Sequence, residues 1–444
     1  MHVTALETLH AQQGEHLVHL QRSYATLLET HGFDAVLLYS GHATAHYADD
    51  QFPAFQTFGH FMHWMPMADI QHSWLLIQPG RNPQLYLHAP TDFWHLPTAL
   101  PDEPWVAAFD VTLSPEPLLP TLPGGRIAIL GDTAALAQAP DAKPDIKPDT
   151  KPNPDALLKA LDELRMHKSA YEISCLRSAN RMALAGHQAA REAFSQGAGE
   201  FDIQLAYLGA SRQRESAVPY QNIIGTNHHA GVLHYQHYDL NASSKHHSLL
   251  VDAGYRYRGY CADITRTQAG PDAPAAFGEL IDAMQQLQTQ LIESVRPGVN
   301  FVDLHRQMHR SLGEVLQSQG LIHCSAEEAV TQGITRAFCP HGLGHSLGLQ
   351  VHDVAGRRLP DGTPNPPPTE HPALRLTREL TPGMVVTIEP GLYFIPMLLE
   401  PLRFAETGKM IDWQRVDALT PCGGIRIEDN IAVTDTGFDN LTAP

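Results

Sequence analysis

The sequence predicts an α+β protein with an N-terminal α/β domain and a C-terminal domain of paired helices and antiparallel strands. Three observations support this prediction. The 444 residues exceed the size of one ordinary domain. A segment rich in Lys, Pro and Asp interrupts the chain at residues 139–155. Beyond it, helical patterns alternate with pairs of apolar runs that are typical of strands. With 43% hydrophobic residues, the chain can bury substantial cores.

Residues 1–138 are predicted to form the first domain. Apolar residues at helical spacing indicate a helix over residues 5–31. Pro, Gly and Asn turns separate the runs that follow. The predicted strands are Asp34–Ser40, Trp74–Gln78, Gln84–His88 and Arg126–Leu130.

The segment APDAKPDIKPDTKPNPD, residues 139–155, is low in complexity and contains no large apolar residue except Ile146. Such a composition cannot build a core, so we expect an exposed and fairly stiff linker. The second domain is therefore predicted to span residues 156–444.

In the second domain, helices are expected from Ala156 to about Phe194 and near 201–215, 274–295 and 301–319. Antiparallel strands are expected at Gln221–Gly225, Val232–Tyr235, Ser248–Asp252, Tyr257–Thr267, 384–389 and 425–433. The Pro-rich stretch between His352 and Leu380 predicts a loop over or beside a functional site.

Charge and cysteine content exclude several classes of partner. The 30 basic and 48 acidic residues give a net charge of −18, which argues against nucleic acid or an anionic membrane as partner. No stretch approaches the 18 apolar residues of a membrane span, and the first residues lack the pattern of a signal peptide. Five scattered cysteines are typical of reduced thiols, so we expect a cytoplasmic protein.

Five hard-ligand side chains, each in its own short strand or loop block, are the most informative feature. Four carboxylates and one imidazole can hold two divalent cations close together, and two such ions sharing a water form a hydrolytic centre. Oxygen ligands with one imidazole suit Mn²⁺, Co²⁺ or Zn²⁺ rather than a thiolate site. The five residues are Asp252, Asp263, His345, Glu389 and Glu428.

Taken singly, each carboxylate leaves an alternative open. Asp252 and Asp263 can share one face of an antiparallel hairpin, or can occupy ordinary turns. Glu389 and Glu428 each end a strand-like apolar run, where an acid opens onto a cleft, but a capping or salt-bridge role fits as well. Arg426 lies two residues before Glu428 and can orient a carboxylate or bind an anion.

The segment HGLGHSLGLQVHD contains His341, His345 and His352. Its glycines make a regular helix unfavourable, so a loop whose backbone approaches a ligand closely is the better interpretation. One of these histidines is then a metal ligand while the others face substrate. The alternative is a set of structural imidazoles in a loop.

Several blocks, in order, resemble one enzyme family. They are VPYQNIIGTNHHAGVLHYQH, VDAGYRYRGYCADITRT, FCPHGLGHSLGLQVHDVAG, ALRLTRELTPGMVVTIEPGLYFI and GGIRIEDN, with HYADDQFPAFQTFGHFMHWMP and the downstream HSW in the first domain. The pattern resembles the pita-bread metallopeptidases, which include methionine aminopeptidase, aminopeptidase P, creatinase and prolidase. It is most similar to bacterial prolidases and their relative organophosphorus acid anhydrolase. The resemblance covers nearly the whole chain and implies a creatinase-like N-terminal domain followed by a pita-bread catalytic domain.

The chain departs from the subgroup in one place. Related bacterial enzymes commonly read YPFKVNPQFKAW where this chain reads FPAFQTFGHFMHW. We therefore expect the first-domain wall of the pocket, and the substrate profile with it, to differ.

The resemblance implies a division of the metal ligands between two divalent ions. Asp263 and Glu428 would bridge both ions, Asp252 would bind one, and His345 with Glu389 would bind the other. We expect Mn²⁺, with Co²⁺ or Zn²⁺ as alternatives.

It also implies roles for the residues around the metals. Glu389 would act as the proton shuttle, and His234 with His352 would steady the substrate carbonyl and the tetrahedral intermediate. Arg375 matches the arginine that binds the proline carboxylate in prolidases. The further substrate-side residues are Arg426 beside the site, His341 and Tyr220 lining the pocket, and Asp50, which would reach a neighbouring subunit's site in a homodimer and face the substrate amine.

The activity implied is hydrolysis of Xaa-Pro dipeptides, with organophosphate triesters as a possible side substrate. Cleavage of longer Xaa-Pro peptides, as by aminopeptidase P, is the alternative, and Arg375 argues against it because longer substrates have no carboxylate there. A non-catalytic binding protein on the same fold is a third hypothesis. The intact set of five ligands argues against that one.

Overall fold

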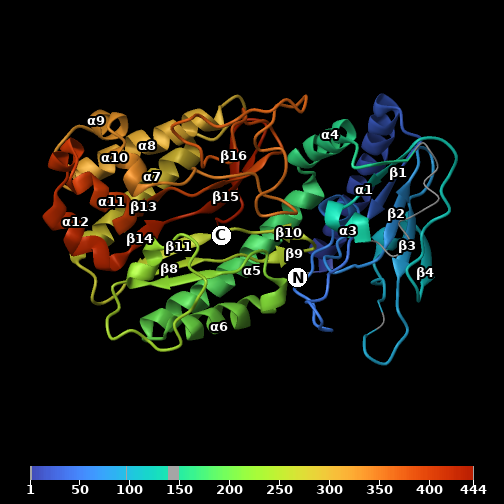
Figure 1. The fold of residues 1–444 in the computed structure, drawn as a ribbon, viewed down its shortest axis with the longest axis horizontal. Coiled ribbons are helices and arrows are strands. Elements are labelled where there is room, and N and C mark those ends of the chain that lie inside the picture. The colour runs from blue at the N-terminus through green and yellow to red at the C-terminus, as the bar shows by residue number, and fades with distance from the viewer. Residues whose placement is uncertain (1–2, 97, 139–149, 444) are drawn as a thin grey trace. The chain divides into compact units, whose positions relative to one another are not determined.

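The computed structural model describes residues 3–96, 98–138 and 150–443. The chain divides into two compact units. The first comprises Met1–Ser174 with Pro360–Gly362, and the second comprises Cys175–Leu359 with Thr363–Pro444. Figure 1 shows the chain coloured from its N-terminus to its C-terminus.

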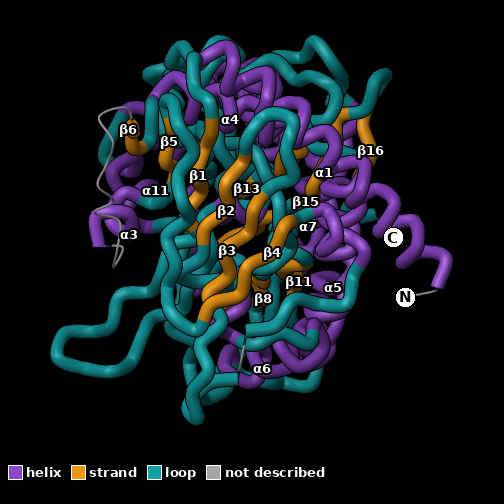
Figure 2. Tube along the Cα trace, turned by 90° about the vertical axis from the view of Figure 1, so that its right-hand side faces the viewer, coloured by secondary structure: helices purple, strands orange, loops and turns teal. Residues whose placement is uncertain are grey.

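The first unit is built on one six-stranded mixed sheet in the order β4-β3-β2-β1-β5-β6. Strand β1 pairs antiparallel with β2 and parallel with β5. In Figure 2 these six strands lie side by side in this order. Their bounds are β1 Ala35–Tyr39, β2 Trp74–Ile77, β3 Gln84–His88, β4 Asp110–Ser114, β5 Ile127–Leu130 and β6 Thr150–Pro152.

Apolar side chains of the helices cover this sheet. Leu20 and Tyr24 of helix α1 pack in one buried cluster with Val36 and Leu38 of β1 and with Leu161 of helix α4. Burial of such side chains is the main force that holds the layer together. The predicted helix and the four predicted strands are confirmed, and β4 is an addition. The helical elements are α1 Val3–His31, α2 Gly59–Met62, η1 Pro104–Ala108, α3 Thr133–Gln138 and α4 Asp155–Met166.

The segment predicted to be a linker differs at its C-terminal end. Residues 139–149 lie outside the described residues, but Thr150–Pro152 form strand β6 and pair in parallel with Ile127–Ile129. Pairing of this kind uses backbone groups and needs no apolar side chains, and a proline is tolerated in an edge strand. The first unit also continues to Ser174. The domain limits given above stay a prediction.

The second unit contains eight helices among the described residues. The predicted helices near 201–215, 274–295 and 301–319 are confirmed, while the run from Ala156 to Phe194 is broken between α4 and α5 at residues 167–169. The helices are α5 Ala170–Ser195, α6 Glu200–Ser211, α7 Ala275–Glu293, α8 Phe301–Ser318, α9 Ala326–Thr331, α10 Ile334–Phe338, α11 Pro396–Arg403 and α12 Trp413–Leu419. Short 3₁₀ turns lie at η2 Glu215–Ala217, η3 Asn227–Gly231, η4 Glu406–Met410 and η5 Thr420–Cys422.

The strands of this unit form two three-stranded antiparallel sheets, β11-β8-β7 and β12-β15-β16, and two small hairpins, β9-β10 and β13-β14. Figure 1 shows α5 and α6 beside the first sheet, and α7 and α8 beside the second group of strands. The strands are β7 Ile223–Thr226, β8 Ser248–Asp252, β9 Arg256–Tyr257, β10 Tyr260–Cys261, β11 Thr265–Ala269, β12 Val385–Ile388, β13 Gly391–Tyr393, β14 Gly424–Arg426, β15 Asp429–Val433 and β16 Phe438–Asn440.

Three strand predictions need correction. Val232–Tyr235 is not a strand but follows the 3₁₀ turn η3, and Tyr257–Thr267 is broken into β9, β10 and β11. The run 425–433 is likewise interrupted at Ile427 and Glu428. One of these breaks is the two-residue turn at Arg258 and Gly259, which joins β9 to β10. The others lie at residues 262–264 and 427–428, which include the candidate ligands Asp263 and Glu428.

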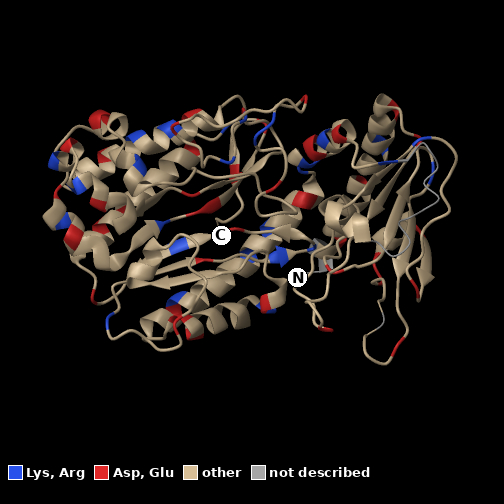
Figure 3. Cartoon of the chain, in the orientation of Figure 1, with Lys and Arg blue, Asp and Glu red and all other residues tan. Residues whose placement is uncertain are grey.

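Three further features concern the charged side chains, the hydropathy of the helices and the cysteines. Acidic and basic side chains are interspersed along the helices of the second unit (Figure 3). Among the described residues, no helix is both long enough and apolar enough to cross a membrane. All five cysteines are free and buried.

A buried histidine on α5 makes the second unit sensitive to acid. His187 Nε2 lies 3.0 Å from the Ala253 carbonyl, and burial lowers the pKa of His187 to about 3 from 6.5. Between these values the unfolded chain binds the extra proton, so stability falls as the pH drops below 6.5. From pH 7 to pH 5 this group should remove about 2 kcal/mol.

The variant His187→Gln can place an amide donor near the position of His187 Nε2, and it has nothing to titrate. Its free energy of unfolding is expected to fall less than that of the wild type between pH 7 and pH 5, by about 2 kcal/mol. Chemical denaturation of both proteins at the two pH values measures this. An equal pH dependence would contradict the assignment.

Candidate metal centre

A cavity of about 660 Å³ opens within the second unit. All five candidate ligands contribute to its lining: Asp252, Asp263, His345, Glu389 and Glu428. The structure thus brings together carboxylates and an imidazole that are up to 176 residues apart along the chain.

The two aspartates meet at a tyrosine. Asp252 ends β8 and Asp263 precedes β11, and the register sets Asp252 opposite Thr265. The Tyr220 hydroxyl lies 2.8 Å from Asp252 Oδ1 and 2.6 Å from Asp263 Oδ1. Tyr220 therefore does more than line the pocket, because its hydroxyl lies within hydrogen-bond distance of both carboxylates and can donate its one proton to either of them.

His345 presents one ring nitrogen to the carboxylates. Its Nδ1 lies 3.0 Å from the Ser346 carbonyl, which can only accept, so Nδ1 carries the proton when the ring is neutral. Nε2 then offers a lone pair, 3.3 Å from Asp263 Oδ2 and 3.7 Å from Glu389 Oε1. This arrangement is typical of metal-ligating histidines, whose second nitrogen is fixed by a carbonyl.

The two glutamates are unfavourably placed without a cation. Glu428 is buried, its Oε1 has no hydrogen-bond partner in the described structure, and its pKa is raised far above the ordinary value by burial and by the neighbouring Asp263 and Glu389 carboxylates. Burial likewise raises the pKa of Glu389 to about 7. Divalent cations would relieve this repulsion and pair the orphaned oxygen. The donor set therefore fits a pair of such ions.

The other two carboxylates are compensated. Burial raises the pKa of Asp252, and Arg426, whose Nη2 lies 2.6 Å from Asp252 Oδ2, opposes that shift. For Asp263, burial opposes ionisation, but the charge and hydrogen bond of His345 in its protonated form, together with the Tyr220 hydroxyl, outweigh it and lower the pKa.

A chain of hydrogen bonds that we did not predict connects the site residues. Arg426 Nη1 donates to the Tyr393 hydroxyl at 2.8 Å, and that hydroxyl lies 2.8 Å from His341 Nε2. Thr265 also was missed, and its hydroxyl donates to Glu428 Oε2 at 2.7 Å while Arg426 Nε donates to it at 3.2 Å. Both Tyr393 and Thr265 could have been found from the sequence by their closeness to predicted ligands. Tyr393 follows Glu389 by four residues, and Thr265 follows Asp263 by two.

Removing the Tyr393 hydroxyl should test this chain. Tyr393→Phe leaves Arg426 Nη1 and His341 Nε2 without their partner in a buried setting, which costs about 1–3 kcal/mol. We expect a lower midpoint of thermal unfolding, together with weaker activity because Arg426 is no longer fixed beside Asp252. Tyr255→Phe, a change in the same unit but outside the cavity lining, is the control. Equal midpoints of thermal unfolding for Tyr393→Phe and Tyr255→Phe would contradict the prediction.

The predicted substrate-side residues also surround this cavity, with one exception. The lining includes His234, Arg375 and His352, whose ring stands at 86° to that of His345 with centroids 4.4 Å apart. Burial lowers the pKa of His352 to about 4, so it is neutral near pH 7. His234 and Arg375 are exposed at the cavity.

The exception is Asp50, which lies in the first unit. It is exposed and its carboxylate accepts from Gln51 Nε2 at 2.8 Å. Its role at a neighbouring subunit's site stays a prediction.

Each of the two parts of the chain matches a known protein family. The model of metallopeptidase family M24 matches residues 174–435, and that of the Xaa-Pro dipeptidase N-terminal domain matches residues 12–162. An Xaa-Pro dipeptidase of Marinobacter nauticus is 50% identical over 432 residues, which is 97% of each chain. One of Pectobacterium carotovorum is 42% identical over 442 residues, covering 98% of this chain and 99% of the relative.

Among solved structures, aminopeptidase P of Escherichia coli with the inhibitor Pro-Leu is similar. It matches with a TM-score of 0.72 at 24% identity, covering 95% of this chain and 94% of that one. The zinc-substituted form of the same enzyme in complex with product matches with a TM-score of 0.70 at 23% identity, over 95% and 94% of the two chains. At these identities the likeness concerns the fold.

Proposed function

This chain belongs to metallopeptidase family M24, and from that premise we propose that it is an Xaa-Pro dipeptidase. The predicted fold is confirmed, with an N-terminal domain of the Xaa-Pro dipeptidase type followed by a pita-bread catalytic domain. It is a metal-dependent hydrolase. The observation that supports the proposal most directly is the cavity in which the five candidate ligands and Arg375 lie together.

We assign two divalent cations to Asp252, Asp263, His345, Glu389 and Glu428. When bound, the cations lower the pKa of water and polarise the substrate carbonyl. In this proposal Asp263 and Glu428 would each help to hold both ions. This arrangement agrees with the clustering of Asp263, His345 and Glu428, whose potential ligand atoms lie within 4.8 Å of one another. Mn²⁺ is proposed because oxygen donors dominate this set.

Proton transfer is assigned to Glu389. Its carboxylate takes a proton from the attacking water and delivers it to the proline nitrogen, which needs it to leave as an amine. The buried position beside His345 holds the carboxylate in place, 3.7 Å from Nε2.

The charge that develops on the carbonyl oxygen requires donors. We assign this role to His234 and His352, which line the cavity with His345. The neutral state of His352 near pH 7 lets it donate one N–H to the oxyanion.

Specificity for dipeptides is assigned to Arg375. Among the described residues no carboxylate pairs with it, so its guanidinium is available at the cavity for a substrate carboxylate. A longer peptide has an amide at that place and would leave the cation unpaired. We also propose phosphotriesters as side substrates. Their tetrahedral phosphorus resembles the tetrahedral intermediate of peptide hydrolysis, so the same pocket can hold it.

The deciding experiment is an assay of metal-free protein on Gly-Pro and Gly-Pro-Ala, after reconstitution with Mn²⁺, Co²⁺ or Zn²⁺ in turn. The proposal expects no turnover without metal, and cleavage of Gly-Pro well above that of Gly-Pro-Ala with Mn²⁺. Faster cleavage of the tripeptide would favour an enzyme of the aminopeptidase P kind, and metal-independent turnover would exclude both.

We further propose a cytoplasmic homodimer. The five free, buried cysteines suit a reducing compartment. Dimerisation follows from the proposed role of Asp50, which needs a second subunit to meet a substrate amine. Sedimentation of wild type and Asp50→Asn, combined with KM for Gly-Pro, tests this part.

A further inference from the structure

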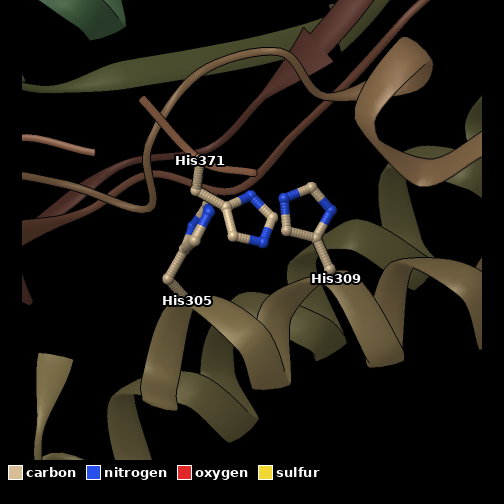
Figure 4. A group of neighbouring side chains, drawn as sticks. All are labelled: His305, His309 and His371. Atoms are coloured by element: carbon tan, nitrogen blue, oxygen red, sulfur yellow. The ribbon is translucent and has the colours of Figure 1, made fainter. Parts of the chain in front are cut away.

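Three histidines outside the cavity converge at one point in the second unit. His305 and His309 lie one turn apart on α8, and His371 lies on the loop that crosses this helix. Figure 4 shows the two helical rings turned toward the ring of His371. The ring centroids are 4.7 Å apart for His305 and His309, 4.3 Å for His305 and His371, and 4.7 Å for His309 and His371.

We propose that His305, His309 and His371 form a binding site for one Zn²⁺ ion, separate from the two-metal centre. Each residue offers one ring nitrogen, and these nitrogens lie within 4.8 Å of one another. None of the three residues contributes to the lining of the catalytic cavity. Three imidazoles and a water in the fourth position make a common tetrahedral zinc site.

The unsatisfied ring nitrogens of His305 point to a ligand. His305 is 1% exposed, and neither of its ring nitrogens has a hydrogen-bond partner in the described structure. A buried polar group of this kind is costly unless something binds it. A cation bound to one ring nitrogen of His305 would give that nitrogen a partner and leave only the other unpaired.

His309 is arranged as a metal ligand usually is. Its Nδ1 lies 3.1 Å from the buried hydroxyl of Thr335 on α10. If Nδ1 donates to that hydroxyl, Nε2 is left with a lone pair toward the other two rings. A fixed second nitrogen of this kind orients the ring and raises its basicity as a ligand.

The surrounding charges set the limits of the site. Burial lowers the pKa of His309 and of His371, and the nearby Arg336 adds to both shifts, so Arg336 opposes a bound cation. Arg306 pairs with Asp303 at 3.3 Å and with Glu370 at 3.6 Å, but in addition to burial it still lowers the pKa of His305 and of His371, so it opposes a cation as well. Binding would also require the rings to turn inward, since nitrogens on one tetrahedral Zn²⁺ lie about 3.3 Å apart.

The site lies beside the substrate-binding loop. The backbone carbonyl of His371 accepts from the Leu374 amide at 3.1 Å. Leu374 in turn packs against Gly342, where an added Cβ would meet the Leu374 Cα at 2.9 Å. Ala373 and Arg375, on either side of Leu374, line the cavity. An ion at the three histidines would thus tie this loop to α8.

The test measures bound Zn²⁺ per chain in the full-length protein by equilibrium dialysis. We expect three equivalents for the wild type and two for His371→Asn and His309→Gln, with three retained by His323→Asn, a change at an exposed histidine of the same unit. Conversely, Asp263→Asn combined with Glu428→Gln should lose the two catalytic equivalents and keep one. Circular dichroism checks that each variant is folded.

Co²⁺ provides a second readout, because cobalt bound to three imidazoles in tetrahedral geometry absorbs visible light more strongly than cobalt in an oxygen-rich site. The double variant with Co²⁺ should show that absorption, and His371→Asn should lack it. Two zinc equivalents in the wild type, or identical stoichiometry and spectra for the wild type and His371→Asn, would overturn the proposal. The three rings would then be packing residues only.

Discussion

Replacing Glu389 with glutamine is expected to lower kcat for Gly-Pro by about 10²- to 10⁴-fold, the usual contribution of a positioned acid–base group. Glutamine preserves the size and one oxygen donor of the side chain, but it cannot accept the proton of water near neutral pH. The loss should appear in kcat rather than in KM, because the carboxylate acts on the proton in transit and not on substrate binding.

Measuring the bound metal distinguishes loss of the proton-transfer group from loss of a metal ligand, because Glu389 is assigned both roles. The Glu389→Gln protein is expected to retain most of its bound metal when assayed with saturating Mn²⁺. Glu379→Gln, at an exposed glutamate ten residues earlier, is the matched control and should behave as wild type. Full activity of Glu389→Gln with metal bound would remove Glu389 from the mechanism.

Replacing Arg375 with methionine is expected to reduce kcat/KM for Gly-Pro by roughly 10- to 150-fold, equivalent to about 1.5–3 kcal/mol for a hydrogen bond between charged groups. Methionine keeps much of the length of the arginine stem and removes only the guanidinium. Steady-state kinetics on the purified variant measure the loss.

The amide Gly-Pro-NH₂ serves as the control substrate, because it lacks the carboxylate that Arg375 is assigned to bind. The wild type should cleave it slowly, and the variant should lose little further activity on it. Arg296→Met, at an exposed arginine of the same unit, should change neither substrate. An equal loss on Gly-Pro and its amide would show that Arg375 acts on the shape of the loop instead.

Much of the fold could be predicted from local patterns. The amphipathic period of Val3–His31 and the short apolar runs of β1, β2, β3, β5, β8 and β12 are properties of neighbouring residues, so they are visible in the sequence. Strands β4 and β6 were not visible in the sequence, because they have few buried apolar side chains. Backbone pairing holds them in the sheet, β4 beside β3 and β6 beside β5.

The candidate ligands could also be predicted, for a chemical reason. A carboxylate at the end of a buried apolar run, as in Asp252 or Glu389, is unfavourable unless a cation or partner compensates it. The sequence therefore reveals which side chains need a ligand. Their neighbours in the blocks that resemble a known family indicated the reaction.

The contacts between those blocks were decided only by the tertiary structure. Tyr220 spans two aspartates 11 residues apart, and Arg426 meets Asp252 across 174 residues. No local period encodes such meetings, because they depend on the path of the whole chain. The same holds for His371, which reaches His305 and His309 from a loop about 60 residues away.

The sequence by itself thus determined the kind of chemistry, because that depends on the types of side chain and on the apolar runs in which they lie. The tertiary structure decided which oxygen and nitrogen atoms face one another. It placed Tyr393 between Arg426 and His341, and gathered three imidazoles that no motif connects. The physical reason is that pairing, charge compensation and metal binding act over a few ångströms in space, whatever the separation along the chain.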